Sequence, residues 1–252
     1  MTTDSVSDRG IFARAWYSRV LHLASLGKKS PLWKGVEFVR DARSHAQGMT
    51  RGTFAQHGED RFVFEYFKGK SGIYVDIGAG HPFTLSNTYL LYRSGWRGIT
   101  VEPILTLHRL HQKWRPDDIH VNGVAGDNAG RQAFFELVPS VLSTIDKKLA
   151  QSLIASGEAV LHARREVEVF CVRDLCERYA NGQAIDLLTI DAEGAELSIL
   201  AGCEFGERGP KVVICELQQF CQSLDWQRVE FLQSRGYRLI KSLGCNGIFE
   251  QR

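Results

Sequence analysis

Acidic side chains crowd one short stretch of the chain, IDLLTIDAEGAELSILAG, at the point where an apolar run ends. The run at 185–190 is mostly apolar, which is typical of a strand buried within a parallel sheet. Asp191, Glu193 and Glu196 follow it within six residues. Ligands of open α/β sheets bind at the carboxyl ends of strands, and a carboxylate there can accept a proton from a hydroxyl. Capping of the next helix explains Glu196 but explains Asp191 poorly, because Asp191 still lies at the mouth of the strand.

A glycine turn within IYVDIGAGHPFTLSNT is the second chemical feature. A short apolar run ends in Asp76, then Gly78, Ala79 and Gly80 form a Gly-x-Gly turn, and Asn87 helps to open a predicted helix. A strand, a glycine turn and a capped helix together describe the first crossover of a nucleotide-binding α/β sheet. Glycines let the backbone approach a ligand closely, because they carry no Cβ. A Gly-x-Gly alone is weak evidence, so the interpretation depends on the rest of the chain.

The next predicted strand, at 99–101, ends in Glu102, which lies 26 positions after Asp76. An acidic residue about 20 positions after the turn is typical of sites that bind both hydroxyls of a ribose. A carboxylate accepts two charge-assisted hydrogen bonds there. A third predicted strand, at 119–124, leads to Asp127, and two interpretations of that residue stay open. Asp127 either accepts a hydrogen bond from an adenine amino group or only opens a hairpin turn into RQAFFELV.

A third polar cluster, Gln56, His57, Glu59 and Asp60, lies just before a predicted amphipathic helix. Taken alone, these residues favour a structural explanation, because acids at a helix N-terminus are stabilised by the positive end of the helix dipole.

The remaining pattern predicts an α/β fold with a mostly parallel sheet. Further helices are predicted at 104–114, 147–154, 174–179 and from 226 to Gly236, and further strands at 166–172, 211–217 and within 237–250. The stretch 140–165, which ends in a basic patch, is expected to form an insertion over the site. The last two strands are joined by a Gly-Cys-Asn-Gly turn. An antiparallel hairpin at the end of a parallel sheet argues against dinucleotide dehydrogenases, which continue with parallel units.

Composition narrows the class of protein. The 252 residues suffice for one large α/β domain with an accessory segment, and 44% hydrophobic and 24% charged residues are ordinary for a globular protein. A net charge of +2 without a dense Lys/Arg run gives no indication of nucleic-acid binding. None of the six cysteines forms a Cys-x-x-Cys pair, so buried, reduced thiols are expected. No apolar run approaches the ~18 residues of a spanning helix and no signal peptide is evident, so a cytoplasmic location is predicted.

Residues 1–50 are predicted to form a helical appendage to a domain at 51–252. Apolar residues at 12, 16, 20 and 23 share one face of a helix at 10–26 that has a basic flank. This helix would suit a membrane surface, although packing against its own domain or a partner subunit, as in a homo-oligomer, is favoured. A second helix is predicted at 33–46, after a break at Ser30-Pro31.

Together, these segments resemble the FkbM-type family of class I S-adenosylmethionine-dependent methyltransferases. The matching segments, which extend from about residue 53 to the C-terminus, are AQHGED, VDIGAGHPFTLSNTYLL, GWRGITVEP, VNGVAGD, LLTIDAEGAELSIL and YRLIKSLGCNGIFE. The combination is much more specific than any single motif. It implies a Rossmann-like class I fold, with a mostly parallel seven-stranded sheet and a C-terminal antiparallel hairpin.

The resemblance also implies how the cofactor S-adenosylmethionine is held across the strand tips. The glycine turn would approach its methionine part, Glu102 its ribose and Asp127 its adenine. Gln56 and Glu59 would cover the amino-acid end, which lowers the weight of the capping explanation for Glu59. The cofactor-binding residues expected in this way are Gln56, Glu59, Asp76, Gly78, Ala79, Gly80, Asn87, Glu102, Asp127 and Asp191. Two positions depart from the family pattern: His81 replaces a third glycine, and Ile104 stands where many relatives have Asn.

The expected reaction is methylation of a hydroxyl on a sugar, a glycan or a polyketide-like metabolite. Asp191, Glu193 or His81 would take the hydroxyl proton. Clustered acids could instead hold a Mg²⁺ ion that lowers the pKa of the hydroxyl. One rival is an NAD-dependent oxidoreductase, disfavoured because Phe83 interrupts the GxGxxG spacing. The other is a non-catalytic scaffold that binds the cofactor or a glycan.

Overall fold

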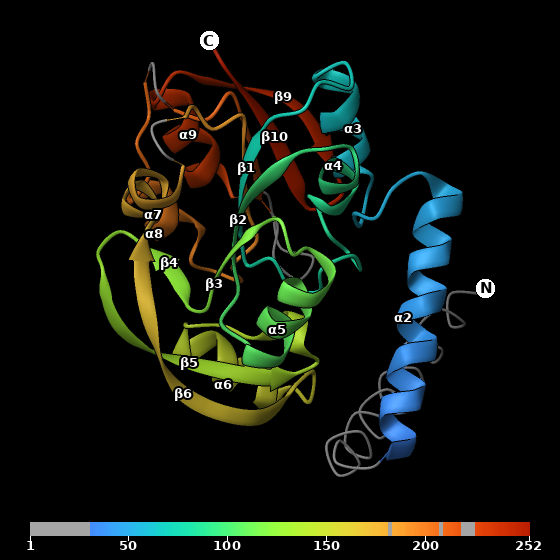
Figure 1. Cartoon of the computed structure of the whole chain (residues 1–252). Helices are drawn as coiled ribbons and strands as arrows, with labels where there is room; N and C mark the ends of the chain where they lie inside the picture. The colour runs from blue at the N-terminus through green and yellow to red at the C-terminus, as the bar shows by residue number, and fades with distance from the viewer. Residues whose placement is uncertain (1–30, 181–182, 207–208, 218–224) are drawn as a thin grey trace, which may run out of the picture.

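A seven-stranded sheet with the order β3-β2-β1-β7-β8-β10-β9 forms the centre of the computed structural model (Figure 1). The structure describes residues 31–180, 183–206, 209–217 and 225–252. Its strands are β1 (Ile73–Ile77), β2 (Arg97–Val101), β3 (Ile119–Val121), β7 (Leu187–Ile190), β8 (Val212–Glu216), β9 (Tyr237–Leu243) and β10 (Asn246–Gln251). Neighbouring strands from β3 to β8 in the sheet (β3, β2, β1, β7 and β8) pair in parallel, whereas β10 pairs antiparallel with both β8 and β9. The predicted parallel sheet with a closing hairpin is confirmed.

Helices cover both faces of this sheet, so its inner strands are buried on two sides. One face packs its apolar side chains against α7 (Val172–Tyr179), α8 (Glu196–Ala201) and α9 (Trp226–Ser234). The other face packs against α3 (Glu59–Tyr66) and α4 (Tyr89–Arg93), while α5 (Leu105–Trp114) lies beside β3. Burial on both faces explains why the parallel strands are nearly continuous apolar runs and could be recognised as such.

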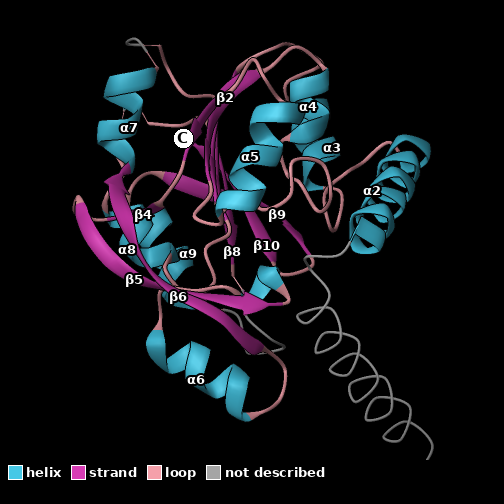
Figure 2. Cartoon of the chain, turned by 60° about the horizontal axis from the view of Figure 1, so that its bottom comes forward, coloured by secondary structure: helices cyan, strands magenta, loops and turns pink. Residues whose placement is uncertain are grey.

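A second, three-stranded sheet with the order β4-β6-β5 lies at one end of the main sheet (Figure 2). Its strands are β4 (Val124–Gly126), β5 (Gly130–Val138) and β6 (Val160–Cys171). Two expectations are wrong here: the strand predicted at 119–124 ends at Val121, and the hairpin considered after Asp127 does not form. The physical reason for the second is that β6 returns between β4 and β5 and takes the hydrogen bonds of both.

The segment between β5 and β6 crosses the end of the molecule. It contains a short 3₁₀ helix, η1 (Ser140–Leu142), and α6 (Lys147–Ala155), whose N-cap Asp146 accepts hydrogen bonds from the backbone N–H groups of Lys148 and Leu149. The helix predicted at 147–154 is confirmed, but the polar stretch before residue 166 is already strand.

The helix α2 (Pro31–Arg51) lies beside the domain (Figure 1). It begins at Pro31, which suits the first turn of a helix because proline has no N–H to pair. Its C-terminal half contacts the loop after the glycine turn, where Ser44 Oγ lies 3.0 Å from Thr84 Oγ1, and the start of α4, where His45 Nε2 lies 3.2 Å from Tyr89 Oη. The helix predicted at 10–26 falls outside the described residues. Within the described part of the chain, no helix has the length and apolar character needed to cross a bilayer.

Candidate active site

The ends of four parallel strands form one row across the carboxyl edge of the main sheet. Val101, Ile77, Ile190 and Cys215 are paired neighbours in β2, β1, β7 and β8. The residues that follow them directly are Glu102, Gly78, Asp191 and Glu216. Because neighbouring strands lie about 4.8 Å apart, the row from Glu102 to Glu216 spans roughly 14 Å. It brings together residues from four distant parts of the sequence.

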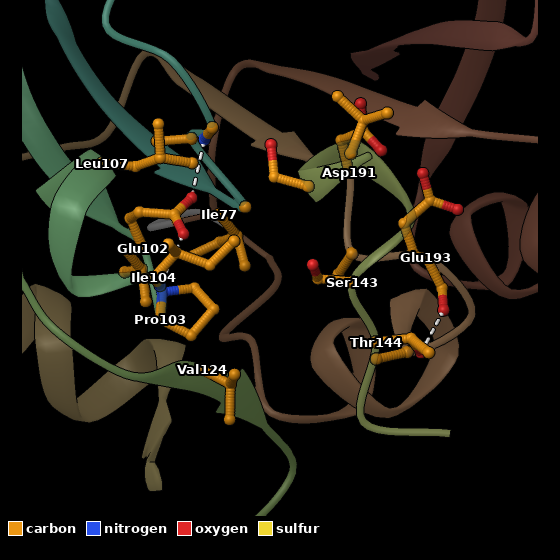
Figure 3. A pocket seen from close by; sticks show the side chains of 18 of the residues that line it. Ile77, Glu102, Pro103, Ile104, Leu107, Val124, Ser143, Thr144, Asp191 and Glu193 are labelled. Atoms are coloured by element: carbon orange, nitrogen blue, oxygen red, sulfur yellow. Dashed lines mark hydrogen bonds between the residues drawn. The ribbon is translucent and has the colours of Figure 1, made fainter. Parts of the chain in front are cut away.

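A cavity of about 790 Å³ opens above this row. Its walls come from the glycine turn, from the ends of β2, β7 and β8, from the start of β4, from the segment around η1 and from the β9–β10 hairpin. Figure 3 shows Glu102 with Pro103 and Ile104 on one side of the cavity and Asp191 with Glu193 on the other. The volume is typical of small-molecule and cofactor sites.

The glycine turn forms part of the floor of the cavity. Gly78 and Gly80 have positive φ angles of 73° and 58°, which disfavour residues with a side chain. A Cβ at Gly78 would lie 1.8 Å from the carbonyl oxygen of Asp191, so the close approach of β1 and β7 also requires glycine there. The N–H groups of Gly78 and Ala79 both donate to the carbonyl of Val101. The turn is therefore fixed to both neighbouring strands.

Glu102 is buried and uses both carboxyl oxygens to hold backbone. Its Oε2 accepts from the Gly80 N–H at 2.8 Å, and its Oε1 accepts from the Ile104 N–H at 2.7 Å. Each oxygen keeps a further lone pair, and the residue lines the cavity. Burial raises the pKa of Glu102 to about 8, since these backbone bonds offset only part of the desolvation. A carboxyl group that lacks a cationic partner and faces a cavity fits a ligand with hydroxyl groups, whichever protonation state it takes.

Beneath the turn, Asp76 belongs to a buried polar network rather than to the cavity wall. Thr88 Oγ1 donates a short hydrogen bond to its Oδ2. Arg115 Nη2 donates to Thr88 Oγ1 at 3.0 Å and to Tyr74 Oη at 2.6 Å, and Arg115 Nε pairs with Asp118 at 2.8 Å. This network supports the strand that carries the glycine turn. Asn87, by contrast, lines the cavity while its Nδ2 donates to Thr189 Oγ1.

The three acids after β7 divide into two kinds. Glu196 is fully buried and committed to its own loop: it accepts from the N–H groups of Ala192 and Gly194 and pairs with Arg228 at 2.7 Å. The carboxyl groups of Asp191 and Glu193 receive no hydrogen bond from a described residue, and both line the cavity. The capping explanation therefore accounts for Glu196 and leaves the other two acids available to a ligand.

The environment of these two acids favours their protonated forms. Asp191 is open to the cavity yet lies deep among protein atoms, and this burial together with the charges of Glu196 and Asp76 raises its pKa to about 7. Burial and the neighbouring Asp191 raise the pKa of Glu193 to about 9. Glu193 also has a φ of 48°, an uncommon backbone conformation for this residue type. Its carbonyl accepts from Thr144 Oγ1 at 2.8 Å (Figure 3), which fastens the η1 segment to the acidic loop.

The cluster before α3 also separates into two parts. Gln56 is exposed and lines the cavity. Glu59 is fully buried below the wall, where it accepts from the His57 N–H and from Asn246 Nδ2 at 2.7 Å. The carboxylate of Asp60 likewise accepts hydrogen bonds within the protein, from the N–H groups of Phe54, Ala55 and Arg61. The geometry puts Gln56 in reach of a ligand and gives Glu59 the role of orienting Asn246.

His81 lines the cavity at its glycine-turn end, but its ring faces other parts of the protein. Nδ1 lies 3.3 Å from the Thr84 N–H, and Nε2 lies 3.4 Å from Asp41 Oδ2 on α2. This geometry favours a role in joining α2 to the turn over a role as a base. Asp127 is exposed and lies outside the cavity, where Ser198 Oγ contacts it at 3.4 Å. Gly123, Val124 and Ala125 line the cavity in that region instead.

Several lining residues were not assigned a role from the sequence. They are Ser143 and Thr144 after η1, Glu216 at the end of β8, and Cys245 and Asn246 in the hairpin. A sequence signal existed for Glu216, an acid at the exit of an apolar strand, but none indicated that the hairpin returns to the site. Among the described residues, no three His, Cys, Asp or Glu side chains are grouped as metal ligands would be.

The sheet order and the site together define a Rossmann-like class I methyltransferase fold. A family model described as "Methyltransferase FkbM domain" matches residues 76–239, so the chain belongs to the FkbM methyltransferase family. Membership makes it a methyltransferase, for which S-adenosylmethionine is the implied methyl donor. The oxidoreductase alternative is thereby set aside.

Other comparisons add little to the family match. A crystal structure of a TehB-like SAM-dependent methyltransferase from Corynebacterium glutamicum is similar to the chain at 11% identity and a TM-score of 0.43. The match covers 86% of this chain and 100% of that one. A comparison with curated proteins finds no match.

Proposed function

We propose that the protein is an O-methyltransferase that acts on a hydroxyl of a sugar, a glycan or a polyketide-like metabolite. The observation that carries this proposal is the pair of uncommitted carboxyl groups, Asp191 and Glu193, facing the cavity across from Glu102. An alcohol is a poor nucleophile while it keeps its proton, so its methylation benefits from a positioned base. Amine or thiol acceptors have less need of such a base.

Residues of the glycine turn and Glu102 would hold the cofactor, and the fit rests on features of this structure. Gly78 and Gly80 keep the floor of the cavity free of side chains, and Glu102 presents its remaining lone pairs to it. Pro103, Ile104, Leu107 and Val124 supply an apolar wall beside Glu102 that suits a purine ring (Figure 3). When bound, S-adenosylmethionine supplies an electrophilic methyl group on a positively charged sulfur.

The residues of the chain then have three tasks. The row of strand ends aligns the ligands, which lowers the entropic part of the barrier. The walls limit the access of water. Asp191, in its ionised form, takes the proton of the acceptor hydroxyl, while Glu193 beside it, with a pKa of about 9, keeps its own proton near neutral pH. A pKa of about 7 is well placed for a base near neutral pH, because the ionised form is populated and still basic.

Methyl transfer from labelled S-adenosylmethionine to a panel of glycans and polyketide-like alcohols tests the proposal. We expect Asp191→Asn to lower turnover by about 10²–10⁴-fold and Glu193→Gln to have a smaller effect. Unchanged turnover in both variants would remove these residues from the chemistry. Binding of S-adenosylhomocysteine without turnover on any acceptor would instead support a non-catalytic scaffold. Loss of activity in EDTA, restored by Mg²⁺, would favour a metal-assisted version.

We also propose that residues 51–252 act as the methyltransferase domain and that residues 1–50 are an appendage. The contacts of α2 with Thr84 and Tyr89 support a docked rather than an integral helix. Activity of a 51–252 fragment against the full chain tests this division.

A further inference from the structure

The cavity extends past the two acids already described to a third, Glu216, at the end of β8. In the row of strand ends, Glu102 follows β2, the glycine turn follows β1, Asp191 follows β7 and Glu216 ends β8. Glu102 and the glycine turn would hold the cofactor on one side of Asp191. Glu216 therefore lies on the opposite side, about one strand spacing beyond Asp191. The acceptor would therefore occupy the part of the cavity beside Glu216.

Glu216 is buried and its carboxyl group has no partner within the described structure. The residue is 8% exposed, and its Oε2 is fully buried without a hydrogen bond. Arg228 donates to the main-chain carbonyl of Glu216 at 2.6 Å, whereas its ion pairs are with the carboxylates of Glu196 and Asp225. A buried carboxyl oxygen left unpaired costs about 1–3 kcal/mol or more. An unpaired carboxyl oxygen in a cavity wall therefore indicates a place where a ligand can form a hydrogen bond.

Two amide side chains line the same cavity as this carboxyl group. Asn246 pairs with Glu216 across the β8–β10 ladder and lines the cavity. Its Nδ2 donates a hydrogen bond to Glu59. This bond fixes the orientation of the amide, so that Oδ1 remains free to accept a hydrogen bond. Gln56 lines the same cavity and makes no side-chain hydrogen bond with a described residue. The set is rich in acceptors and contains no cationic side chain.

We propose that Glu216, with Asn246 and Gln56, binds a second hydroxyl of the acceptor, next to the hydroxyl that Asp191 deprotonates. The substrate class is therefore a diol or a larger polyol, such as a sugar ring, rather than an isolated alcohol. This inference rests on the proposed O-methyltransferase function. The spacing supports it, because two carboxyl groups on neighbouring strands can each reach one of two hydroxyls on neighbouring carbons.

The charge of the site favours a neutral diol over an amino alcohol. Burial, with Asp191 and Glu196 nearby, raises the pKa of Glu216 to about 8, so its carboxyl group is largely neutral at pH 7 and both donates and accepts. A hydroxyl group also does both. A neutral carboxyl group can exchange hydrogen bonds with a hydroxyl, but it gives a cationic amine no opposite charge to pair with.

Binding of two matched probes tests the inference. They are cis-1,2-cyclohexanediol and cyclohexanol, which differ only in the second hydroxyl, titrated by saturation-transfer NMR into protein saturated with S-adenosylhomocysteine. We expect the wild type to bind the diol about tenfold more tightly, as one net hydrogen bond in a buried site allows. Glu216→Leu should abolish this preference without changing cyclohexanol binding, and Glu216→Gln, which keeps a donor and an acceptor, should retain part of it. Glu230→Gln, an exposed change on α9, serves as the matched control.

The outcomes separate the inference from the function on which it rests. Failure of the wild type to bind S-adenosylhomocysteine would count against the methyltransferase site itself. Binding of S-adenosylhomocysteine by all variants, with no preference of the wild type for the diol, would overturn the role of Glu216 alone. Tighter binding of cis-2-aminocyclohexanol than of the diol, lost in Glu216→Leu, would also overturn it, because the site would then select a cation.

Discussion

Glu102 holds the glycine turn in place: its Oε2 accepts a 2.8 Å hydrogen bond from the N–H of Gly80, 22 residues earlier in the chain. The bond joins the ends of β1 and β2 at the point where a nucleoside would lie. His111 adds a second bond to the same residue, with its Nε2 3.1 Å from the Gly80 carbonyl. The acid expected to bind the ribose is thus also the residue that shapes the turn.

This dual role predicts a large effect of Glu102→Gln on cofactor affinity. The amide cannot accept from both Gly80 and Ile104, because its second head atom is an NH₂ group that only donates. We expect the Kd for S-adenosylhomocysteine, measured by calorimetry, to rise about 10- to 100-fold, as a buried group left unsatisfied at a cost of ~1–3 kcal/mol implies. Glu65→Gln, an exposed change on α3, should leave the Kd unchanged. A wild-type Kd in Glu102→Gln would place the nucleoside elsewhere.

The position of Asp127 gives a second prediction for the same measurement. Its side chain is exposed and lies outside the cavity, whereas Val124 and Ala125 line it. Asp127→Ala is therefore expected to change the Kd for S-adenosylhomocysteine less than twofold, within about 0.4 kcal/mol. A tenfold loss of affinity would restore the adenine-binding role that the family resemblance implies.

The pKa of Asp191 predicts how activity depends on pH. A base must be ionised, and burial with the neighbouring Glu196 raises the pKa of Asp191 to about 7. We expect kcat/KM to rise with pH through an inflection near 7 and to level off above it, with loss of activity on the acid side. The inflection should disappear in Asp191→Asn. The acids titrate as a coupled group, so the inflection describes the cluster and should shift in Glu193→Gln as well.

Much of this site follows from local sequence, and the reason is physical. Strands buried on both faces are apolar runs, and a polar residue directly after such a run marks the carboxyl edge of the sheet. Glu102 and Asp191 could be found in this way. Pairing then brings them into one row, as the register of Val101, Ile77 and Ile190 demonstrates.

The parts that sequence did not reveal depend on contacts between distant residues. β6 begins at Val160 and runs through the charged stretch HARRE, whose side chains give no strand pattern, yet β5 pairs with it along its length. β4 is separated from β3 by Asn122 and Gly123, and a Cβ at Gly123 would lie 2.6 Å from the Glu168 carbonyl on β6. Asn246 enters the site only because β10 pairs with β8. In each of these cases the segments that contact one another lie far apart in the sequence, or their local pattern does not indicate the contact.

Replacing the ionisable carboxyl group of Glu216 is expected to increase the stability of the folded protein at high pH. Its pKa is raised from 4.5 to about 8, so its contribution to folding is full below about pH 4 and is lost as pH rises through about 8. Glu216→Gln should match the wild type at pH 5 and be more stable at pH 9, by ~1–2 kcal/mol or roughly 3–6 °C in Tm. Differential scanning calorimetry at the two pH values measures this. Equal Tm values at pH 9 would mean that Glu216 is better solvated than its burial indicates.

Two arginine–aspartate pairs allow a matched test of the buried network under the glycine turn. Arg115 and Asp118 are both fully buried, whereas Arg97 and Asp117 are about half exposed. Arg115→Met leaves the buried carboxylate of Asp118 without its cationic partner and should lower the free energy of unfolding by ~3–5 kcal/mol, measured by urea denaturation. Arg97→Met should cost no more than about 1 kcal/mol. Similar losses in both variants would contradict a supporting role specific to the buried pair.

His81 provides the last prediction, because its two expected roles differ in their consequences. Its ring bridges the Thr84 N–H and Asp41 of α2, which favours a structural role. His81→Gln should then keep turnover within a factor of about ten, whereas loss of a general base costs about 10²–10⁴-fold. It should also speed hydrogen exchange in the C-terminal half of α2, because that half would dock less firmly. Asp41→Ala removes the same contact from the α2 side and should reproduce the faster exchange. Turnover that collapses in His81→Gln but not in Asp41→Ala would identify the imidazole as the base, whereas parallel behaviour of the two variants would identify it as the anchor of α2.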